Sequence, residues 1–138
     1  MPPWREIDTV MFDMDGTLLD LHFDNYFWQS LVPQVYSKAN GVSEREALDF
    51  LMEKYTEVYG TLKWYCLDYW ADQLQLDVVA LKATETNRIK IRPNVKNLLE
   101  ALQQSNKKIL LVTNAHPSSL DIKMKHTKID TYFHNCIS

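Results

Sequence analysis

An apolar run that ends in aspartates constrains the fold of this chain more than any other feature. The run occupies residues 8–13, DTVMFD, and ends at Asp13, with Asp15 two positions further on. A continuous apolar run, without alternation, is typical of a strand that is covered on both faces in a parallel sheet. Residues 108–113, KILLVT, show the same pattern, and residues 132–138 are a third candidate. The chain is therefore expected to be an α/β protein with a parallel sheet of two or three strands.

The remaining periodic segments predict helices, because their apolar residues recur every three or four positions. The predicted helices are 23–39, 44–59, 64–74, 78–88, 93–104 and 117–126. Pro33 is expected to kink or divide the first of them. Ser43 and Glu46 form a capping box at the start of the second.

The stretch between the first two strands is much longer than a crossover connection requires. A parallel crossover needs about a dozen residues, most of them in one helix. The excess predicts a helical subdomain, residues 22–89, inserted into a sheet domain that consists of residues 1–21 and 90–138.

Composition excludes several classes of partner. The net charge of −3 argues against nucleic acid as the main partner, since phosphate backbones require a basic surface. No apolar run approaches the ~18 residues that span a membrane, so none is expected to do so. Cys66 and Cys136 do not form a C-x-x-C motif, which favours reduced thiols and a cytoplasmic protein.

Polar residues follow both predicted strands at the point where each ends. Asp13 and Asp15 follow the first strand, and Thr113 and Asn114 follow the second. Ligands bind beyond the carboxyl ends of the strands in an open parallel sheet, so these residues are expected at one site. Two crowded carboxylates repel each other, and a hard divalent cation, usually Mg²⁺, relieves that repulsion.

This set of residues suits phosphoryl chemistry. One carboxylate can attack phosphorus as a nucleophile, while the other transfers protons. Gly16 allows backbone N–H groups to turn toward a phosphate oxygen, and Thr113 can donate its hydroxyl. An ordinary turn is the alternative interpretation of Asp15-Gly16 taken alone. No glycine-rich nucleotide loop and no G-x-S-x-G motif offers another chemistry.

The segments FDMDGTLLD and ILLVTN together resemble the haloacid dehalogenase-like (HAD) hydrolase superfamily. Its first motif is D-x-D-G-T, and its second is an apolar strand that ends in Thr or Ser. The resemblance implies a HAD-like, Rossmann-type sheet with a helical cap after the first strand.

The resemblance also implies that Asp13 is the nucleophile that forms an aspartyl-phosphate. Asp15 would be the general acid/base and Thr113 would bind the phosphoryl group. The dehalogenase branch lacks the second aspartate, so Asp15 indicates a phosphatase. Asp13 and Asp15 would hold Mg²⁺. The further residues expected to bind substrate at this motif pair are Gly16, Thr17 and Asn114.

Three longer stretches look like the bacterial GMP/IMP nucleotidase group of that superfamily. They are DLHFDNYFW (20–28), GTLKWYCLDYW (60–70) and TNAHPSSLDIK (113–123). The resemblance implies a purine nucleoside monophosphate, a small phosphomonoester, as substrate. The cap residues expected to face it are Asn25, Lys63, Trp64 and Tyr65. The alternative for the aromatic residues is that they pack the core of the cap. His116 is expected to cap a helix or support its neighbours.

Two later motifs of the family, a lysine and an acidic pair that completes the Mg²⁺ site, are not found before Ser138. Lys123 and Lys125 precede the third strand and are weak candidates for the lysine. We therefore expect a C-terminally truncated chain with a poor metal site and low turnover. Two alternatives stay open: a sugar-phosphate phosphatase or phosphomutase, and a catalytically inactive binding or assembly module. An open sheet edge would also allow two copies to pair as a homodimer.

Overall fold

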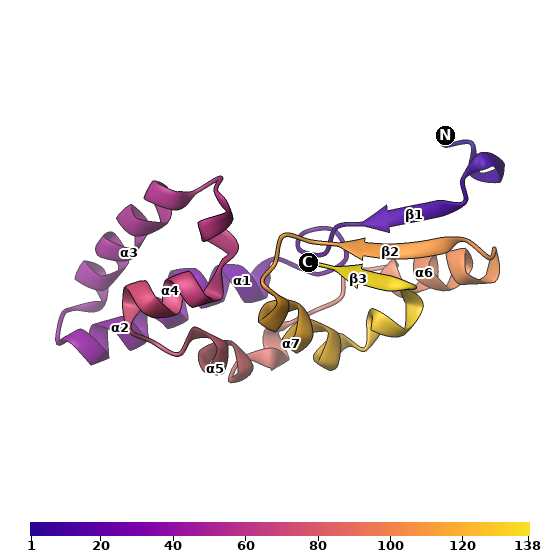
Figure 1. Ribbon diagram of the computed structural model, residues 1–138. Helices are drawn as coiled ribbons and strands as arrows, with labels where there is room; N and C mark the ends of the chain where they lie inside the picture. Colours follow the sequence, from indigo (N-terminus) through magenta and orange to yellow (C-terminus); the bar gives the residue numbers. More distant parts are fainter.

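A computed structural model describes all 138 residues of the chain. Three parallel strands, β1 (Thr9–Phe12), β2 (Lys108–Val112) and β3 (Asn135–Ile137), form one sheet in the order β1-β2-β3 (Figure 1). The helices are α1 (His22–Tyr26), α2 (Val32–Asn40), α3 (Glu44–Val58), α4 (Leu67–Leu74), α5 (Val78–Ala83), α6 (Val95–Gln104) and α7 (Pro117–Thr127). The prediction of an α/β fold with a short parallel sheet and a long helical stretch after β1 is confirmed.

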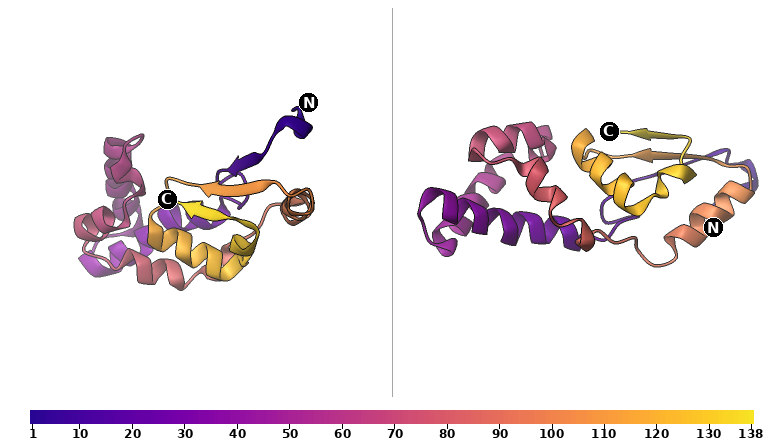
Figure 2. Two further views of the ribbon diagram at one scale, coloured as in Figure 1. Left: turned by 45° about the vertical axis from the view of Figure 1, so that its right-hand side comes forward. Right: turned by 90° about the horizontal axis from the view of Figure 1, so that it is seen from below.

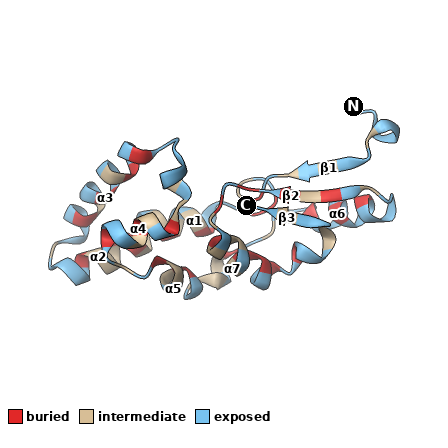
Figure 3. Ribbon diagram, in the orientation of Figure 1, coloured by how far each residue is buried: buried red, intermediate tan, exposed pale blue.

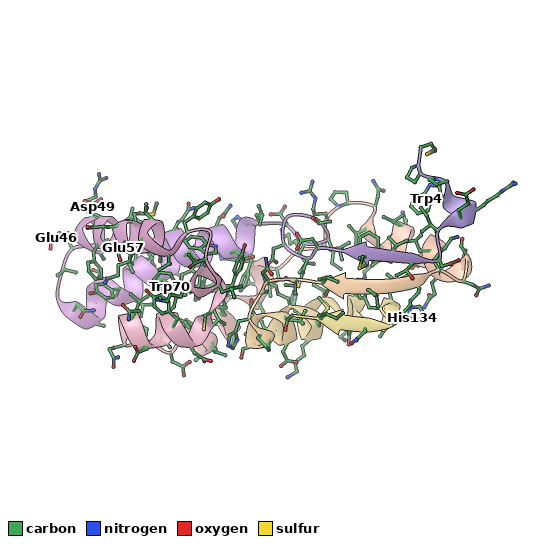
Figure 4. All side chains as sticks on the ribbon, turned by 45° about the horizontal axis from the view of Figure 1, so that its top comes forward. Trp4, Glu46, Asp49, Glu57, Trp70 and His134 are labelled. Carbon is green, nitrogen blue, oxygen red and sulfur yellow. The ribbon has the colours of Figure 1, made fainter.

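The buried apolar side chains form two clusters, one in each half of the molecule. The first packs α6 and α7 against the sheet and includes Leu99, Ile109 and Leu111. The second lies among α2 to α5 and includes Leu51 and Trp70. Figure 4 shows Trp70 among the helices, at the opposite end of the molecule from Trp4 and His134. Two separate cores are what an inserted helical subdomain would produce, and the division at residues 22–89 stays a prediction.

The sheet is covered on one face only, so the expectation of two covered faces is wrong. In the second view of Figure 2, from below, α7 lies in front of the strands and α6 lies beside them, and both helices belong to the one cluster that packs on Ile109 and Leu111. Both helices lie on one side because two successive right-handed crossovers run in the same direction across the sheet. Side chains on the other face are therefore exposed, including Met11 (69%), Val112 (40%) and Ile137 (45%). Figure 3 accordingly shows no buried residue in β1 or β3.

Two predicted helices are shorter than expected. The helix predicted at 64–74 is interrupted at Cys66, whose backbone is extended (φ −82°, ψ 106°). A separate 3₁₀ turn, Leu62–Tyr65, precedes it. The helix predicted at 78–88 ends at Ala83, and a short 3₁₀ turn follows.

Pro33 and Pro93, which both lie within predicted helices, behave differently. In the helix predicted at 23–39, a π-helical turn, Phe27–Leu31, separates α1 from α2, and Pro33 occupies the first turn of α2. Pro33 has no N–H to donate, which is the physical reason for the predicted division. Pro93 lies outside α6, because Asn94 adopts a left-handed backbone (φ 68°) and the helix begins after it.

No helix has both the length, 18 residues, and the apolar character that crossing a membrane requires.

Candidate functional site

The loop after β1 brings two carboxylates to one cavity. Met14 is fully buried in the sheet cluster, while Asp13 on one side of it is exposed and Asp15 on the other is half-buried. Asp13 and Asp15 both line a cavity of about 650 Å³. Thr113 and Asn114, which follow β2, line the same cavity. The parallel pairing of β1 with β2 causes this, because it places both strand ends at the same edge.

The β1 loop is held by a compact set of hydrogen bonds. Gly16 has φ +79°, its N–H donates to the Leu19 carbonyl at 2.8 Å, and its own carbonyl accepts from Arg92 Nη1 at 3.0 Å. Thr17 Oγ1 lies 3.3 Å from Asp13 Oδ2 and donates to it. Gly16 and Thr17 are not among the residues that line the cavity. In this structure they shape the loop and orient Asp13.

Thr113 presents a hydroxyl proton that its protein neighbours do not use. Its backbone N–H donates to the Ile137 carbonyl at 2.9 Å, so β3 fixes its position. Its Oγ1 accepts a hydrogen bond from the Ala115 N–H at 3.1 Å. A hydroxyl that accepts through a lone pair keeps its own proton for another acceptor. Thr113 is therefore suited to donate to an oxygen of a ligand in the cavity.

Four charged side chains form a network that joins the two halves of the molecule. We call it the ion-pair network: Asp15, Lys123, Asp24 and Lys82. Lys123 Nζ lies 2.6 Å from Asp15 Oδ1 and 2.7 Å from Asp24 Oδ2. Lys82 Nζ lies 3.4 Å from Asp24 Oδ1. Asp24 belongs to α1, Lys82 to α5 and Lys123 to α7. Two positive and two negative charges balance, which makes their burial tolerable.

Burial dominates the electrostatics of this network. Burial raises the pKa of Asp15, and the nearby Lys123 ammonium opposes that shift. Burial lowers the pKa of Lys82, and Asp24 opposes that shift in turn. The Lys82 ammonium also lies 4.7 Å from the centre of the Phe27 ring, a cation–π contact that offsets part of its desolvation. Lys82 lines the cavity, so it contributes positive charge to the cavity wall.

The far end of the cavity is aromatic and belongs to the helical half. Its aromatic lining residues are Trp28, Tyr55, Tyr59, Trp64 and Tyr65. Trp64 is half-buried and meets Tyr55 edge-on, with ring centres 5.9 Å apart. Burial raises the pKa of Tyr55, whose hydroxyl donates to the Trp28 carbonyl at 2.9 Å. Trp64 therefore both packs against the helical cluster and lines the cavity, and its exposed neighbour Tyr65 lines the cavity as well.

The other predicted cap residues lie in different surroundings. Asn25 lines the cavity, whereas Lys63 does not; the Lys63 ammonium is exposed, 5.6 Å from the centre of the Tyr69 ring. His116 caps α7, as predicted, because its Nδ1 accepts from the Ser118 N–H at 3.1 Å. The ring proton is then on Nε2, which lies 3.3 Å from Asp68 Oδ2.

The strand tips offer one free carboxylate to a cation. No three His, Cys, Asp or Glu side chains gather into a metal site. Asp13 makes no ion pair, whereas the Asp15 carboxylate is engaged by Lys123. Mg²⁺ commonly takes one or two protein carboxylates and completes its shell with substrate phosphates and water. The donor set therefore fits Mg²⁺ through Asp13, with Asp15 committed to its lysine.

Sequence reasoning did not identify Asp24 or Lys82, and it gave Lys123 little weight. One signal was available on α7, where Ser119, Lys123 and Thr127 follow each other at four-residue spacing. All three are buried, so they share the inner face of the helix. A lysine between two small polar residues on an inner face indicates a buried ion pair.

The chain is similar to known proteins over most of its length. Residues 7–138 match the family model described as haloacid dehalogenase-like hydrolase. The chain is 49% identical over 129 residues to the GMP/IMP nucleotidase YrfG of Escherichia coli (strain K12), and equally to that of Shigella flexneri. Each match covers 94% of this chain and 58% of the relative, so the chain spans little more than half of their length.

A solved structure shows the same fold. The crystal structure of the HAD phosphatase from Thermococcus onnurineus superposes with a TM-score of 0.81 at 24% identity. The match covers 94% of this chain and 61% of that one.

Proposed function

The chain belongs to the haloacid dehalogenase-like hydrolase family, and from this we propose that it hydrolyses phosphomonoesters through an aspartyl-phosphate on Asp13. The observation that carries the proposal is that Asp13, Asp15 and Thr113 line one cavity. A nucleophile, a proton carrier and a hydroxyl donor are the groups that phosphoryl transfer to a carboxylate requires.

In this proposal each side chain has one task. The Asp13 carboxylate attacks phosphorus, and the bond to the leaving oxygen breaks as Asp15, which is protonated when the substrate binds, gives that oxygen its proton and becomes the carboxylate that pairs with Lys123. Water then attacks the aspartyl-phosphate while Asp15 takes the water proton, which releases phosphate and restores Asp13. Thr113 donates its hydroxyl to a phosphoryl oxygen throughout. Bound Mg²⁺, held by Asp13, would supply positive charge against the phosphoryl oxygens.

We further propose a purine nucleoside monophosphate as the substrate. The relatives at 49% identity are named GMP/IMP nucleotidases. A volume of about 650 Å³ is in the ordinary range for a small-molecule site. The aromatic end of the cavity supports the idea, because Trp64 or Tyr65 can stack on a base, and Asn25 can hydrogen-bond to it. Lys63 could reach such a ligand only by leaving Tyr69.

The test is phosphate release by the chain with Mg²⁺ from GMP, IMP, AMP and glucose 1-phosphate. The proposal expects release from GMP and IMP above the others, and none from the Asp13→Asn variant. Preference for the sugar phosphate would instead favour the sugar-phosphate phosphatase. Equal release by Asp13→Asn would contradict the mechanism.

One observation favours a second candidate, a binding module without turnover: no group of three His, Cys, Asp or Glu side chains is placed to hold a metal ion. Calorimetric binding of GMP with no phosphate release would support this candidate. A cytoplasmic location and a homodimer formed through the open edge of the sheet are also proposals; sedimentation of the purified chain tests the second.

A further inference from the structure

Lys123 is buried in a place where a charged side chain loses its hydration. Its side chain is 2% exposed, while that of Lys125 on the same helix is 77% exposed and pairs with Asp121 at the surface. A buried ammonium has to be neutralised and hydrogen-bonded, since water cannot reach it. Lys123 meets this need with two carboxylates from different parts of the fold, Asp15 and Asp24.

The two contacts fix the direction of the Asp15 carboxylate. Charge-assisted hydrogen bonds of 2.6 and 2.7 Å are at the short end of their range and are stronger than neutral ones. Lys123 cannot follow Asp15 toward solvent, because its own side chain is enclosed. Asp24 is the second carboxylate that binds Lys123, and it is itself paired with Lys82.

We propose that Lys123 is a positioning residue that holds the Asp15 carboxylate against the cavity, and that Asp24 ties this position to helix α1. The inference deepens the proposed function and rests on it. It gives Lys123 a task at the proton carrier, with no contact to the nucleophile. Because Asp24 is in the helical half and Asp15 in the sheet half, displacement of α1 from α7 releases Lys123 and loosens Asp15.

A held carboxylate favours one kind of ligand over another. Asp15 faces the leaving or entering oxygen, which carries a developing charge only in the transition state. A fixed Asp15 therefore strengthens binding of a five-coordinate phosphorus mimic more than binding of the ground-state nucleotide. Lys123 therefore contributes to the affinity for the five-coordinate mimic and hardly to the affinity for the nucleotide.

The experiment compares these two affinities in the full chain with Mg²⁺ present, by calorimetry. The probes are orthovanadate, as the five-coordinate mimic, and GMP. The variants are Lys123→Met, which keeps most of the side-chain length and removes the charge, and Lys125→Met, the matched control on the same helix. Circular dichroism and a melting curve establish that each variant is folded.

Lys123→Met is expected to weaken the affinity for orthovanadate by about tenfold or more and the affinity for GMP by less than about threefold. Lys125→Met is expected to change neither affinity. Equal weakening of both probes would mean a merely structural lysine and overturn the inference, as would two unchanged affinities. If Lys123→Met does not fold, Asp24→Asn provides the comparison, because it leaves Lys123 in place but removes the charge that ties Lys123 to α1. Unchanged vanadate affinity in Asp24→Asn overturns the inference. Failure of the unmodified chain to bind either probe overturns the proposed function itself, a distinct result.

Discussion

Replacing Thr113 with valine removes both tasks that the structure gives its hydroxyl, and two measurements tell the losses apart. Valine has the same shape, so the side chain still fills the buried position after β2. The substitution removes the acceptor of the Ala115 N–H bond at 3.1 Å. It also removes the proton that Thr113 offers to the cavity.

Each loss has an expected magnitude. A buried N–H left without a partner costs about 1–3 kcal/mol, so the free energy of unfolding should fall by that amount. A hydrogen bond to a charged group contributes about 1.5–3 kcal/mol, which predicts a loss of phosphate affinity of roughly 10- to 150-fold. Thr113→Ser is the matched control: it keeps both hydrogen bonds and loses one methyl group, or about 0.8 kcal/mol of stability.

Urea denaturation followed by circular dichroism gives the stability, and calorimetry with inorganic phosphate and Mg²⁺ gives the affinity. Thr113→Val should have both lower stability and lower phosphate affinity, and Thr113→Ser should bind phosphate about as tightly as the unmodified chain. Phosphate affinity of Thr113→Val equal to that of the unmodified chain would refute the role of the hydroxyl, even if stability fell as expected.

Three further predictions concern the framework of the site. Trp70→Ala should lower the free energy of unfolding by about 3–5 kcal/mol in urea titrations, because Trp70 is 1% exposed and packs the helical cluster; a loss below about 1 kcal/mol would contradict that role. Gly16→Ala should lower the free energy of unfolding by about 1–2 kcal/mol, because its backbone is left-handed, and should also weaken phosphate binding. Gly41→Ala, with φ +65° and open space around it, should lower the free energy of unfolding alone. Equal phosphate affinity in the two variants would argue against the role of the β1 loop. Met11→Thr should change the free energy of unfolding by less than about 0.5 kcal/mol, and Ile109→Ala should lower it by about 2–5 kcal/mol, because only Ile109 lies on the covered face of the sheet. Similar losses of stability in the two variants would show that both faces are covered.

Local rules predicted those features that depend on neighbours in sequence. Ser43 accepts from the Glu46 N–H at 3.1 Å, as a capping box predicts from residue types alone. The cavity location of Asp13 and Thr113 follows from the rule that parallel strands end at one edge, which needs only the two strand patterns. These are short-range or topological inferences, and residue types carry them.

Features that depend on distant partners could not be predicted in this way. The ion pairs of Lys123 join residues 99 and 108 positions apart, and that of Lys82 with Asp24 spans 58 positions. The uncovered sheet face has a similar cause. Met11 and Val112 are as apolar as their covered neighbours, and residue type does not reveal that both helices pack on one side.

The central claim is that Asp13 captures the phosphoryl group, and trapping the intermediate tests it most directly. The Asp15→Asn variant, in which release of the intermediate should be slow, is mixed with phosphate-labelled GMP and Mg²⁺, quenched in acid and digested. The label is predicted on the peptide that contains Asp13, and it should be absent when Asp13→Asn is added. Label on any other peptide, or label that persists without the Asp13 carboxylate, would contradict the account.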